Sequence, residues 1–451
     1  MAYTISKIVS QFKADVGKAL SAETIVKICG YLGHAWRERV LDPVTTVHVF
    51  LVQILHGNTA CTALSRLTGV SFTGAAYCAA RLRLPLALFE DLLERVCEAL
   101  YPELQKIGRW RGHRTWCMDG SGFSMSDTPE LQDHFGQPGC QAKGCGFPVA
   151  HMLALFHAGT GLLLRVVASP LRTHDMRHSS LLHEELDEGD ILLADRGFAS
   201  FAHLARVFLR NMHAVFRCHQ KQIVQFRVGR KHKGRGKHKK HKKGMPSSRY
   251  IRRLGHWDQL VEYAKPMAKP AWIEENTWVS LPDTLLVREL RYRKAQRGHR
   301  SKVVTLVTTL LDPVAYPATE LADLYLSRWQ IEVNIRHLKI TMGMDILHCQ
   351  TVQGVMKELH MFSVAYNLVR LVMLEASRRQ KVPPDRISFL DALRWIRIAK
   401  PDSPLTPLRV NPLRPNRIEP RVLKRRIKEF PLMKTPRDIL RKALARKKLV
   451  A

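Results

Sequence analysis

No stretch of about 18 uncharged apolar residues occurs in the sequence, although a helix that crosses a membrane needs roughly that length. The most apolar stretch is VAHMLALFHAGTGLLLRVVA, which is interrupted by His151, His157, Arg165 and a Gly-Thr-Gly turn. This pattern predicts two strands of a hairpin. The N-terminal stretch MAYTISKIVSQFKADVG lacks the continuous apolar core of a signal peptide. We therefore expect a cytoplasmic protein without a membrane partner.

Cysteine is also scarce, with nine residues scattered over a chain of 451. An odd number without regular spacing does not suggest a disulfide framework, so we expect reduced thiols. Cys140, Cys145 and His151 come nearest to the spacing of a zinc site, but no second Cys-x-x-Cys or His pair accompanies them. A zinc site is therefore the less favoured interpretation of these three residues.

Acidic residues are few in comparison with basic ones. The chain has 39 Asp and Glu against 72 Lys and Arg, which gives a formal charge of +33. Such an excess indicates a polyanionic partner, with nucleic acid favoured over an anionic membrane surface. Residues 229–253 contain no acidic residue at all, so we predict an extended or disordered loop until phosphates neutralise it. A solvated charge run and a nuclear-localisation signal are the alternatives for this loop.

The chain is too long for a single hydrophobic core, so more than one domain is expected. Apolar residues at intervals of three and four predict helices from about residue 6 to 105 and again from 355 to 379. Within the first region, residues 61–85 fit a helix-turn-helix and an ordinary helical hairpin equally well. Strand patterns dominate between the two helical regions, including a hairpin that turns at 159–161.

Two aspartates follow predicted strands. Asp119 comes after the apolar residues of TWCM, and Asp195 comes after ILLA, so each is expected at the carboxyl end of a strand. Open α/β sheets keep their binding and catalytic sites at that edge. Either aspartate alone could instead cap the turn that follows its strand.

The stretch YLSRWQIEVNIRHLK places Tyr325, Arg328, Glu332 and Lys339 on one stripe of a predicted helix. A second, apolar stripe is predicted to pack against the sheet, and it consists of Leu324, Ile331, Ile335 and Leu338. An exposed stripe with an Arg328–Glu332 ion pair of about 0.3 to 0.5 kcal/mol is the simpler interpretation. That interpretation requires neither the tyrosine nor the lysine.

With this spacing the chain resembles the DDE transposases of the insertion-sequence-four family. The hallmark of that family is Y-x2-R-x3-E-x6-K, which the sequence matches at every position from Tyr325 to Lys339. Other stretches that resemble the family are DGSGFSMSDTPE, FGQPGCQAKGCGFP, ILLADRGF, VTLVTTLLDP and EPRVLKRRIKEFPLMKTPR. Together they span about residues 58–437, which is most of the chain.

The resemblance implies an α/β fold with a ribonuclease-H-like catalytic core, interrupted by a β-rich insertion, between an N-terminal helical domain and a basic C-terminal tail. The expected boundaries are 1–108 for the helical, DNA-binding candidate domain, 109–212 and 312–385 for the two parts of the core, 213–311 for the insertion with its basic loop, and 386–451 for the tail.

The resemblance also implies the site and its partners. Asp119, Asp195 and Glu332 would be catalytic and would bind two divalent metal ions, Mg²⁺ or Mn²⁺, because hard cations prefer oxygen ligands. Tyr325, Arg328 and Lys339 would bind DNA. The expected partners are double-stranded DNA at transposon ends and target, and a second copy of the chain on that DNA, at the nucleoid of a bacterial cytoplasm. The alternatives are a non-enzymatic basic nucleic-acid-binding protein and a metal-dependent nuclease without strand transfer.

Overall fold

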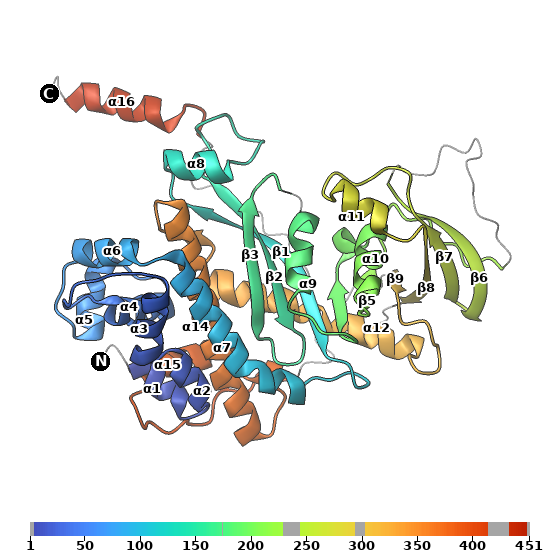
Figure 1. The fold of residues 1–451 in the computed structure, drawn as a ribbon, viewed down its shortest axis with the longest axis horizontal. Coiled ribbons are helices and arrows are strands. Elements are labelled where there is room, and N and C mark those ends of the chain that lie inside the picture. Colours follow the sequence, from blue (N-terminus) through green and yellow to red (C-terminus); the bar gives the residue numbers. More distant parts are fainter. Residues whose placement is uncertain (1–3, 174, 229–243, 294–302, 414–432, 449–451) are drawn as a thin grey trace.

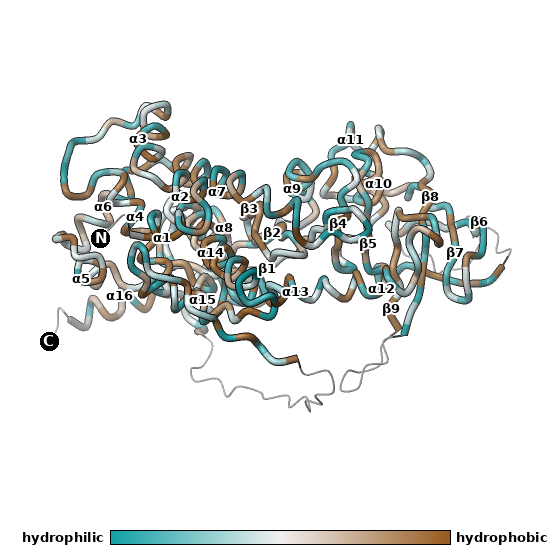
Figure 2. The backbone as a smooth tube through the Cα atoms, turned by 90° about the horizontal axis from the view of Figure 1, so that it is seen from below, coloured by the Kyte–Doolittle hydropathy of each residue, from teal (hydrophilic) through white to brown (hydrophobic). Residues whose placement is uncertain are grey.

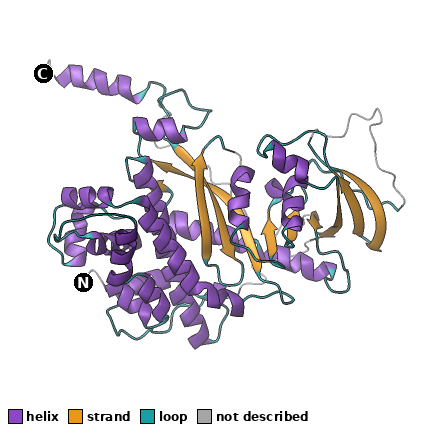
Figure 3. Cartoon of the chain, viewed as in Figure 1, coloured by secondary structure: helices purple, strands orange, loops and turns teal. Residues whose placement is uncertain are grey.

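The structure is a computed structural model that describes residues 4–173, 175–228, 244–293, 303–413 and 433–448. The predicted mixed α/β class is confirmed. Helices are concentrated at one end of the molecule and a large mixed sheet extends towards the other (Figure 3). Among the described residues, no helix has both the length and the apolar character needed to cross a membrane.

The N-terminal part of the described chain is helical, as predicted. Its helices are α1 (Thr4–Ser10), α2 (Ala14–Ala19), α3 (Ala22–Tyr31), α4 (Pro43–Leu55), α5 (Leu64–Thr68), α6 (Gly74–Arg83) and α7 (Leu86–Lys106). Side chains at helix starts satisfy free backbone N–H groups, as where Asp42 accepts from the N–H of Thr45 at 2.6 Å. The pair α5 and α6 encloses a turn in which Gly69 ends α5 at a φ of 69°. Two short helices around a glycine turn are therefore present, and this geometry suits both predicted interpretations of the segment.

One sheet runs through the rest of the described chain. Its strands are β1 (Thr115–Met125), β2 (Val149–His157), β3 (Leu163–Pro170), β4 (Ile191–Ala194), β5 (His213–Arg217), β6 (Ser247–Gly255), β7 (Asp258–Ala264), β8 (Thr284–Arg293), β9 (Val303–Thr308) and β10 (Ile346–Leu347). The spatial order is β3-β2-β1-β4-β5-β9-β8-β7-β6, and β10 pairs with β1. The hairpin β2–β3 is antiparallel, as expected, whereas β1, β4 and β5 are parallel neighbours.

Shorter helices surround this sheet. They are α8 (Pro129–Phe135), α9 (Ser179–His183), α10 (Phe201–Leu209), α11 (Glu275–Ser280), α12 (Ala318–Ser327) and α13 (Trp329–Arg336). Helix α10 packs against β5, and α12 contacts both β5 and β8. The next helix, α13, lies against β1, and these packing contacts bring the chain back to the centre of the sheet.

Two predicted segments differ from the structure. The expected insertion begins at residue 213 and so includes β5, but β5 pairs with β4 in the parallel part of the sheet, and β9 to β6 then extend the same sheet. Strand pairing is nonlocal, so the run of strand patterns could not reveal this continuity. The predicted loop 229–253 ends in a strand, because residues from Ser247 onward form β6 opposite β7. Residues 229–243 lie outside the described residues.

Helix α14 (Val352–Gln380) joins the helical end to the sheet (Figure 1). It contacts α4, α7 and β3, and its residues from Leu359 to Leu374 are buried on all sides. The perpendicular view in Figure 2 shows the same order, with α14 between the N-terminal helices and β1. The helix predicted for 355–379 is thus confirmed.

The tail prediction is wrong for residues immediately after 386. Helix α15 (Phe389–Ile398) packs against α14 and buries Phe389, Leu393, Trp395 and Ile396. Its apolar side chains alternate with charged ones, so composition alone did not distinguish it from a basic appendage. By contrast, α16 (Arg437–Lys448) projects away from the rest of the molecule in Figure 1.

Buried ion pairs fix the strands that carry the site. Nε of Arg114 donates to Oδ1 of Asp190 at 2.7 Å, and the indole of Trp116 donates to Oδ2 of the same aspartate at 2.8 Å. Because Arg114 precedes β1, Trp116 is its second residue and Asp190 precedes β4, these bonds lock the two parallel strands in register.

A second buried arginine positions α13. Nη2 of Arg370 on α14 donates to Oδ1 of Asn334 at 2.6 Å, and its Nε donates to the carbonyl of Gly161 at 3.1 Å. Gly161 has a φ of 69°, and a Cβ at this position would lie 1.6 Å from the Arg370 guanidinium. Only glycine therefore allows the hairpin turn and α13 to share this arginine.

Candidate active site

The two aspartates lie at the same level, on or directly after neighbouring strands. Met118 pairs with Ala194 in the parallel register of β1 and β4, so Asp119 and Asp195 are the next residue on each strand. The prediction that Asp119 ends its strand is wrong, because β1 continues to Met125 while still paired with β2. It is the neighbour β4 that ends. Asp119 is therefore in mid-strand, next to the position at which β4 ends, because β1 remains paired with β2 beyond that point.

The predicted single helix from 325 to 339 is divided into three parts. Helix α12 ends at Ser327, α13 starts at Trp329, and a π-helical turn (His337–Thr341) follows. The N–H of Arg328 bonds to the carbonyl of Tyr325, and the N–H of Met342 reaches back five residues to His337, so the helical phase changes twice. Even so, Leu324, Ile331, Ile335 and Leu338 are all buried, and the apolar stripe is confirmed.

Five of the predicted residues contact one another across these elements. The hydroxyl of Tyr325 donates to Oδ1 of Asp195 at 3.4 Å. Nη2 of Arg328 donates to Oε1 of Glu332 at 2.9 Å, and Nη1 lies 3.5 Å from Oδ2 of Asp119. The guanidinium also lies over the Tyr325 ring, 5.7 Å from its centroid. The structure therefore brings Asp119, Asp195, Tyr325, Arg328 and Glu332 into one network.

Lys339 lies next to this network and has different partners. Its Nζ donates to the carbonyl of Gly122 at 2.5 Å and to Oγ of Ser121 at 3.2 Å, and it forms an ion pair with Asp345 at 2.9 Å. These contacts attach the π-helical turn to β1 two and three residues beyond Asp119. Lys339 is thus close to the site, but its contacts hold the π-helical turn against β1.

Burial strongly affects Asp119. Desolvation raises the pKa of its carboxyl group to about 6, opposed by the Gly120 N–H and by Arg328, and reinforced by the charges of Asp195 and Glu332. The N–H of Gly120 lies 2.9 Å from Oδ1 of Asp119. A carboxylate that is buried among other carboxylates is stabilised by additional positive charge, so this position favours a cation.

The donor set fits divalent metal ions of the Mg²⁺ type. Three carboxylates supply only hard oxygen ligands, and burial disfavours the charged form of Asp119 unless positive charge is nearby. In the part of the chain that the structure describes, no three Asp, Glu, His or Cys side chains are close enough to enclose an ion. Arg328 contacts both Asp119 and Glu332.

Two side chains that the sequence analysis did not select also border the site. Phe216 pairs with Ala194, so Arg217 follows at the level of Asp195 on the next strand, and its charge lowers the pKa of Tyr325 that burial raises. Trp329 follows Arg328 and is 59% exposed. Arg217 could be identified only from the parallel pairing of β5 with β4. The signal for Trp329 is an exposed indole within the motif.

Comparison with known proteins gives the family. The family model described as a transposase DDE domain matches residues 110–368, which include the three carboxylates. The chain belongs to the DDE transposases. The match covers more than half of the sequence and includes β1, β4 and α13.

This DDE transposase is similar to two curated transposases, one of which belongs to insertion sequence element IS4. The chain is 25% identical over 296 residues to the transposase InsG for insertion sequence element IS4 of Escherichia coli strain K12, which covers 62% of this chain and 58% of that protein. It is 29% identical over 124 residues to the putative transposase InsZ of the same strain, which covers 27% of this chain and 41% of the relative. The matches therefore span little more than half of the first relative and less than half of the second.

A solved structure aligns over much of this transposase. The piggyBac transposase synaptic complex with hairpin DNA superimposes with a TM-score of 0.46 at 9% identity, over 85% of this chain and 79% of that chain.

Proposed function

We propose that the protein is a DNA transposase that cleaves transposon ends and transfers the resulting 3′-hydroxyl into target DNA. Asp119, Asp195 and Glu332 are the catalytic carboxylates. The observation that carries the proposal is the matching register of Asp119 and Asp195, with Arg328 connecting Asp119 to Glu332. The order β3-β2-β1-β4-β5, three antiparallel strands followed by two parallel ones, supports a ribonuclease-H-like core.

The three carboxylates would hold two divalent metal ions, Mg²⁺ or Mn²⁺, which supply activation of the nucleophile and stabilisation of the leaving oxygen when bound. In the first reaction, the oxygen of a water forms a bond to phosphorus and the bond from phosphorus to the 3′ oxygen breaks. The products are a 3′-hydroxyl and a 5′-phosphate. In the second, that 3′ oxygen forms a bond to the phosphorus of a target phosphodiester, and the bond from this phosphorus to the target's 3′ oxygen breaks. The products are a new phosphodiester and a 3′-hydroxyl on the target strand. The proton of each nucleophile passes to solvent, and each leaving oxygen takes up a proton.

The cationic side chains orient DNA around this centre. Arg328 has a planar guanidinium suited to two phosphate oxygens, and it can exchange its carboxylate partners for them. Tyr325 holds Asp195 through its hydroxyl. Lys339 contributes a point charge next to Ser121 and Gly122. We further propose that two copies act together on paired DNA ends, at the nucleoid of a bacterial cell.

The proposal is tested with linear DNA that carries the inverted repeats flanking the coding sequence. With Mg²⁺, the parent protein should nick this DNA at the repeat ends, whereas Asp119→Asn and Glu332→Gln should bind the same DNA without cutting it. Equal cleavage by either variant would contradict the assignment of the carboxylates. Absence of metal-dependent cleavage in the parent, with salt-sensitive binding kept, would favour a non-enzymatic binding protein.

Strand transfer needs a separate assay. End fragments that already carry a free 3′-hydroxyl are mixed with supercoiled plasmid and Mg²⁺, and the joined product is measured on a gel. A transposase gives joined molecules. A metal-dependent nuclease cuts but joins nothing.

A further inference from the structure

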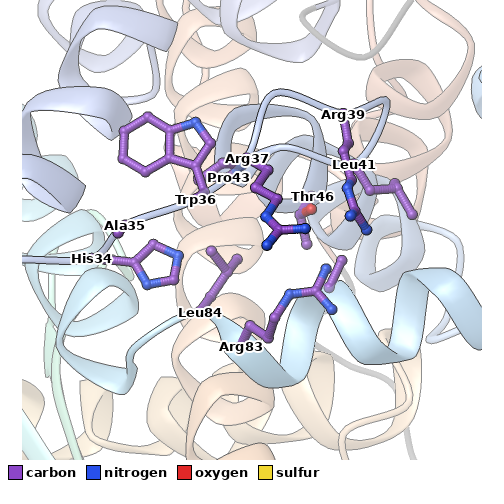
Figure 4. Close-up of a pocket in the computed structure, with 11 residues that line it drawn as sticks. His34, Ala35, Trp36, Arg37, Arg39, Leu41, Pro43, Thr46, Arg83 and Leu84 are labelled. Atoms are coloured by element: carbon purple, nitrogen blue, oxygen red, sulfur yellow. The ribbon is translucent and has the colours of Figure 1, made fainter.

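A basic pocket lies in the helical end of the protein, away from the carboxylates. It has a volume of about 410 Å³ and is enclosed by the segment between α3 and α4, the start of α4 and the end of α6. Its charged lining side chains are Arg37, Arg39 and Arg83, and Figure 4 shows their guanidinium groups directed into the same space. Like charges repel, so this convergence is unfavourable unless an anion joins them.

No acidic side chain in the described part of the chain neutralises the three arginines. Among the described residues, none of Arg37, Arg39 and Arg83 forms an ion pair with a carboxylate. Glu38 and Asp42 are close in sequence, but neither lines the pocket. The Asp42 carboxylate instead caps α4. The site therefore has donors and positive charge without an internal counterion.

A second observation points independently to a ligand. Thr46 lines the pocket, is only 1% exposed, and its hydroxyl has no hydrogen-bond partner in the described part of the chain. A buried hydroxyl without a partner is costly, by about 1 to 3 kcal/mol, so such groups usually have a function or a ligand. Thr46 lies in the first turn of α4, where the helix dipole also favours an anion.

Aromatic rings form one wall of the same space. Trp36 is 38% exposed, and its indole stacks on His34 with 6.2 Å between ring centroids. Burial lowers the pKa of His34, and Arg83 and Lys357 lower it further, which agrees with a positive potential in the pocket. A flat apolar wall next to guanidinium groups suits a phosphate that carries a sugar and base.

We propose that Arg37, Arg39, Arg83 and Thr46 bind a phosphate group, and that this group belongs to the backbone of DNA. The site is separate from the carboxylates, so it serves to hold DNA and takes no part in cleavage. The inference rests on the DNA-binding part of the proposed function only. Its chemistry, a phosphate oxygen that accepts from guanidinium N–H groups and one hydroxyl, could also accept free phosphate.

The experiment measures binding of a fluorescein-labelled oligonucleotide to the full chain by anisotropy, in EDTA, at several salt concentrations. Arg37→Ala and Arg83→Ala should each weaken binding and reduce the slope of log K against log salt by about 1. Thr46→Val keeps the side-chain shape and should weaken binding about tenfold. Arg394→Ala is the matched control, because Arg394 is an exposed arginine of α15 outside the pocket.

Inorganic phosphate, added at constant ionic strength, distinguishes the two sources of the ligand. If the pocket binds the DNA backbone, millimolar phosphate should displace little of the labelled oligonucleotide. If the pocket is a free-anion site, phosphate should displace the oligonucleotide, and Arg83→Ala should lose this displacement. Only the first result supports the assignment to DNA, and the second overturns it in favour of a free anion. The proposal is overturned if the pocket variants bind DNA and phosphate like Arg394→Ala, or if Thr46→Val only stabilises the fold. Because EDTA suppresses cleavage, neither result depends on the catalytic assignment.

Discussion

Nη1 of Arg328 lies 3.5 Å from Oδ2 of Asp119, on the side of the guanidinium that does not bind Glu332. The arginine thus connects two carboxylates that come from a strand and a helix more than 200 residues apart. A side chain with a permanent positive charge stabilises these carboxylates before any metal ion is present. If the carboxylates hold metal ions as proposed, we expect the ions and Arg328 to compete for the same oxygens.

This competition makes an unusual prediction for Arg328→Ala. Removal of the guanidinium should increase the affinity for Mn²⁺, because the carboxylates lose their internal partner, while cleavage should fall by about 100-fold through loss of a phosphate contact. Mn²⁺ binding is measured by electron paramagnetic resonance of the free ion. Cleavage is measured on end-repeat DNA.

Arg336→Ala provides the comparison. Arg336 lies on the same helix α13 and is exposed, so its removal takes away the same charge without changing the contacts of Asp119. We expect its Mn²⁺ affinity and cleavage rate to match the parent. A loss of Mn²⁺ binding in Arg328→Ala would show that the arginine supports the metal site instead of competing with it.

Metal binding should also be visible as stability. A ligand that binds only the folded state at a hundred times its dissociation constant adds about 2.7 kcal/mol to the free energy of unfolding. Mg²⁺ should therefore raise the melting temperature of the parent, and Asp119→Asn and Asp195→Asn should abolish that rise. Asp133→Asn, an exposed aspartate of α8, should leave it intact. An equal rise in melting temperature for the parent and all three variants would show that Mg²⁺ binds elsewhere.

Much of this site could be predicted from local sequence pattern. Periodicity alone predicts the apolar stripe through Ile331 and Leu338 and the position of Asp195 after ILLA. This is possible because the pattern of apolar neighbours indicates which helix face and which strand are buried. The motif spacing then connected Glu332 to the two aspartates. Family resemblance supplied their role.

Other features depend on contacts that are distant in sequence. Asp119 is in mid-strand because β2 remains paired beyond the end of β4, and Arg217 borders the site because β5 is parallel to β4. The helix break at Arg328 coincides with its contacts to Asp119 and Glu332 on opposite sides. None of these partners can be found from the residues adjacent to each position.

Lys339 is expected to have a structural role in addition to any contact with DNA. Lys339→Ala removes charged hydrogen bonds to Gly122 and Ser121 and an ion pair with Asp345, so it should lower the free energy of unfolding by about 1.5 to 3 kcal/mol. Urea denaturation measures this change. Asp345→Asn keeps the lysine and its bonds to β1, and should cost less than about 1 kcal/mol because Asp345 is half exposed. An unchanged stability in Lys339→Ala would leave DNA contact as its role.

A buried pair of histidines should make the protein sensitive to acid. Nε2 of His183 and Nε2 of His203 lie 2.9 Å apart, and Nδ1 of His203 donates to the carbonyl of Phe198, in the turn that follows Asp195. Burial lowers the pKa of both rings, that of His203 to about 4. Below pH 6.5 the unfolded chain binds protons that the folded pair does not, so stability is complete above pH 6.5 and is lost as the pH falls towards 4.

The loss from His203 should amount to about 2 to 3 kcal/mol over that range. It is measured by urea denaturation at pH 7.5 and pH 5. The double variant His183→Leu/His203→Leu has no group to titrate here, so its stability should change less between the two pH values than that of the parent. His134→Leu, which removes an exposed histidine of α8, should retain the parent's pH dependence. If the double variant is as sensitive to acid as the parent, other buried histidines cause the loss, and the turn after Asp195 is not the acid-labile part of the site.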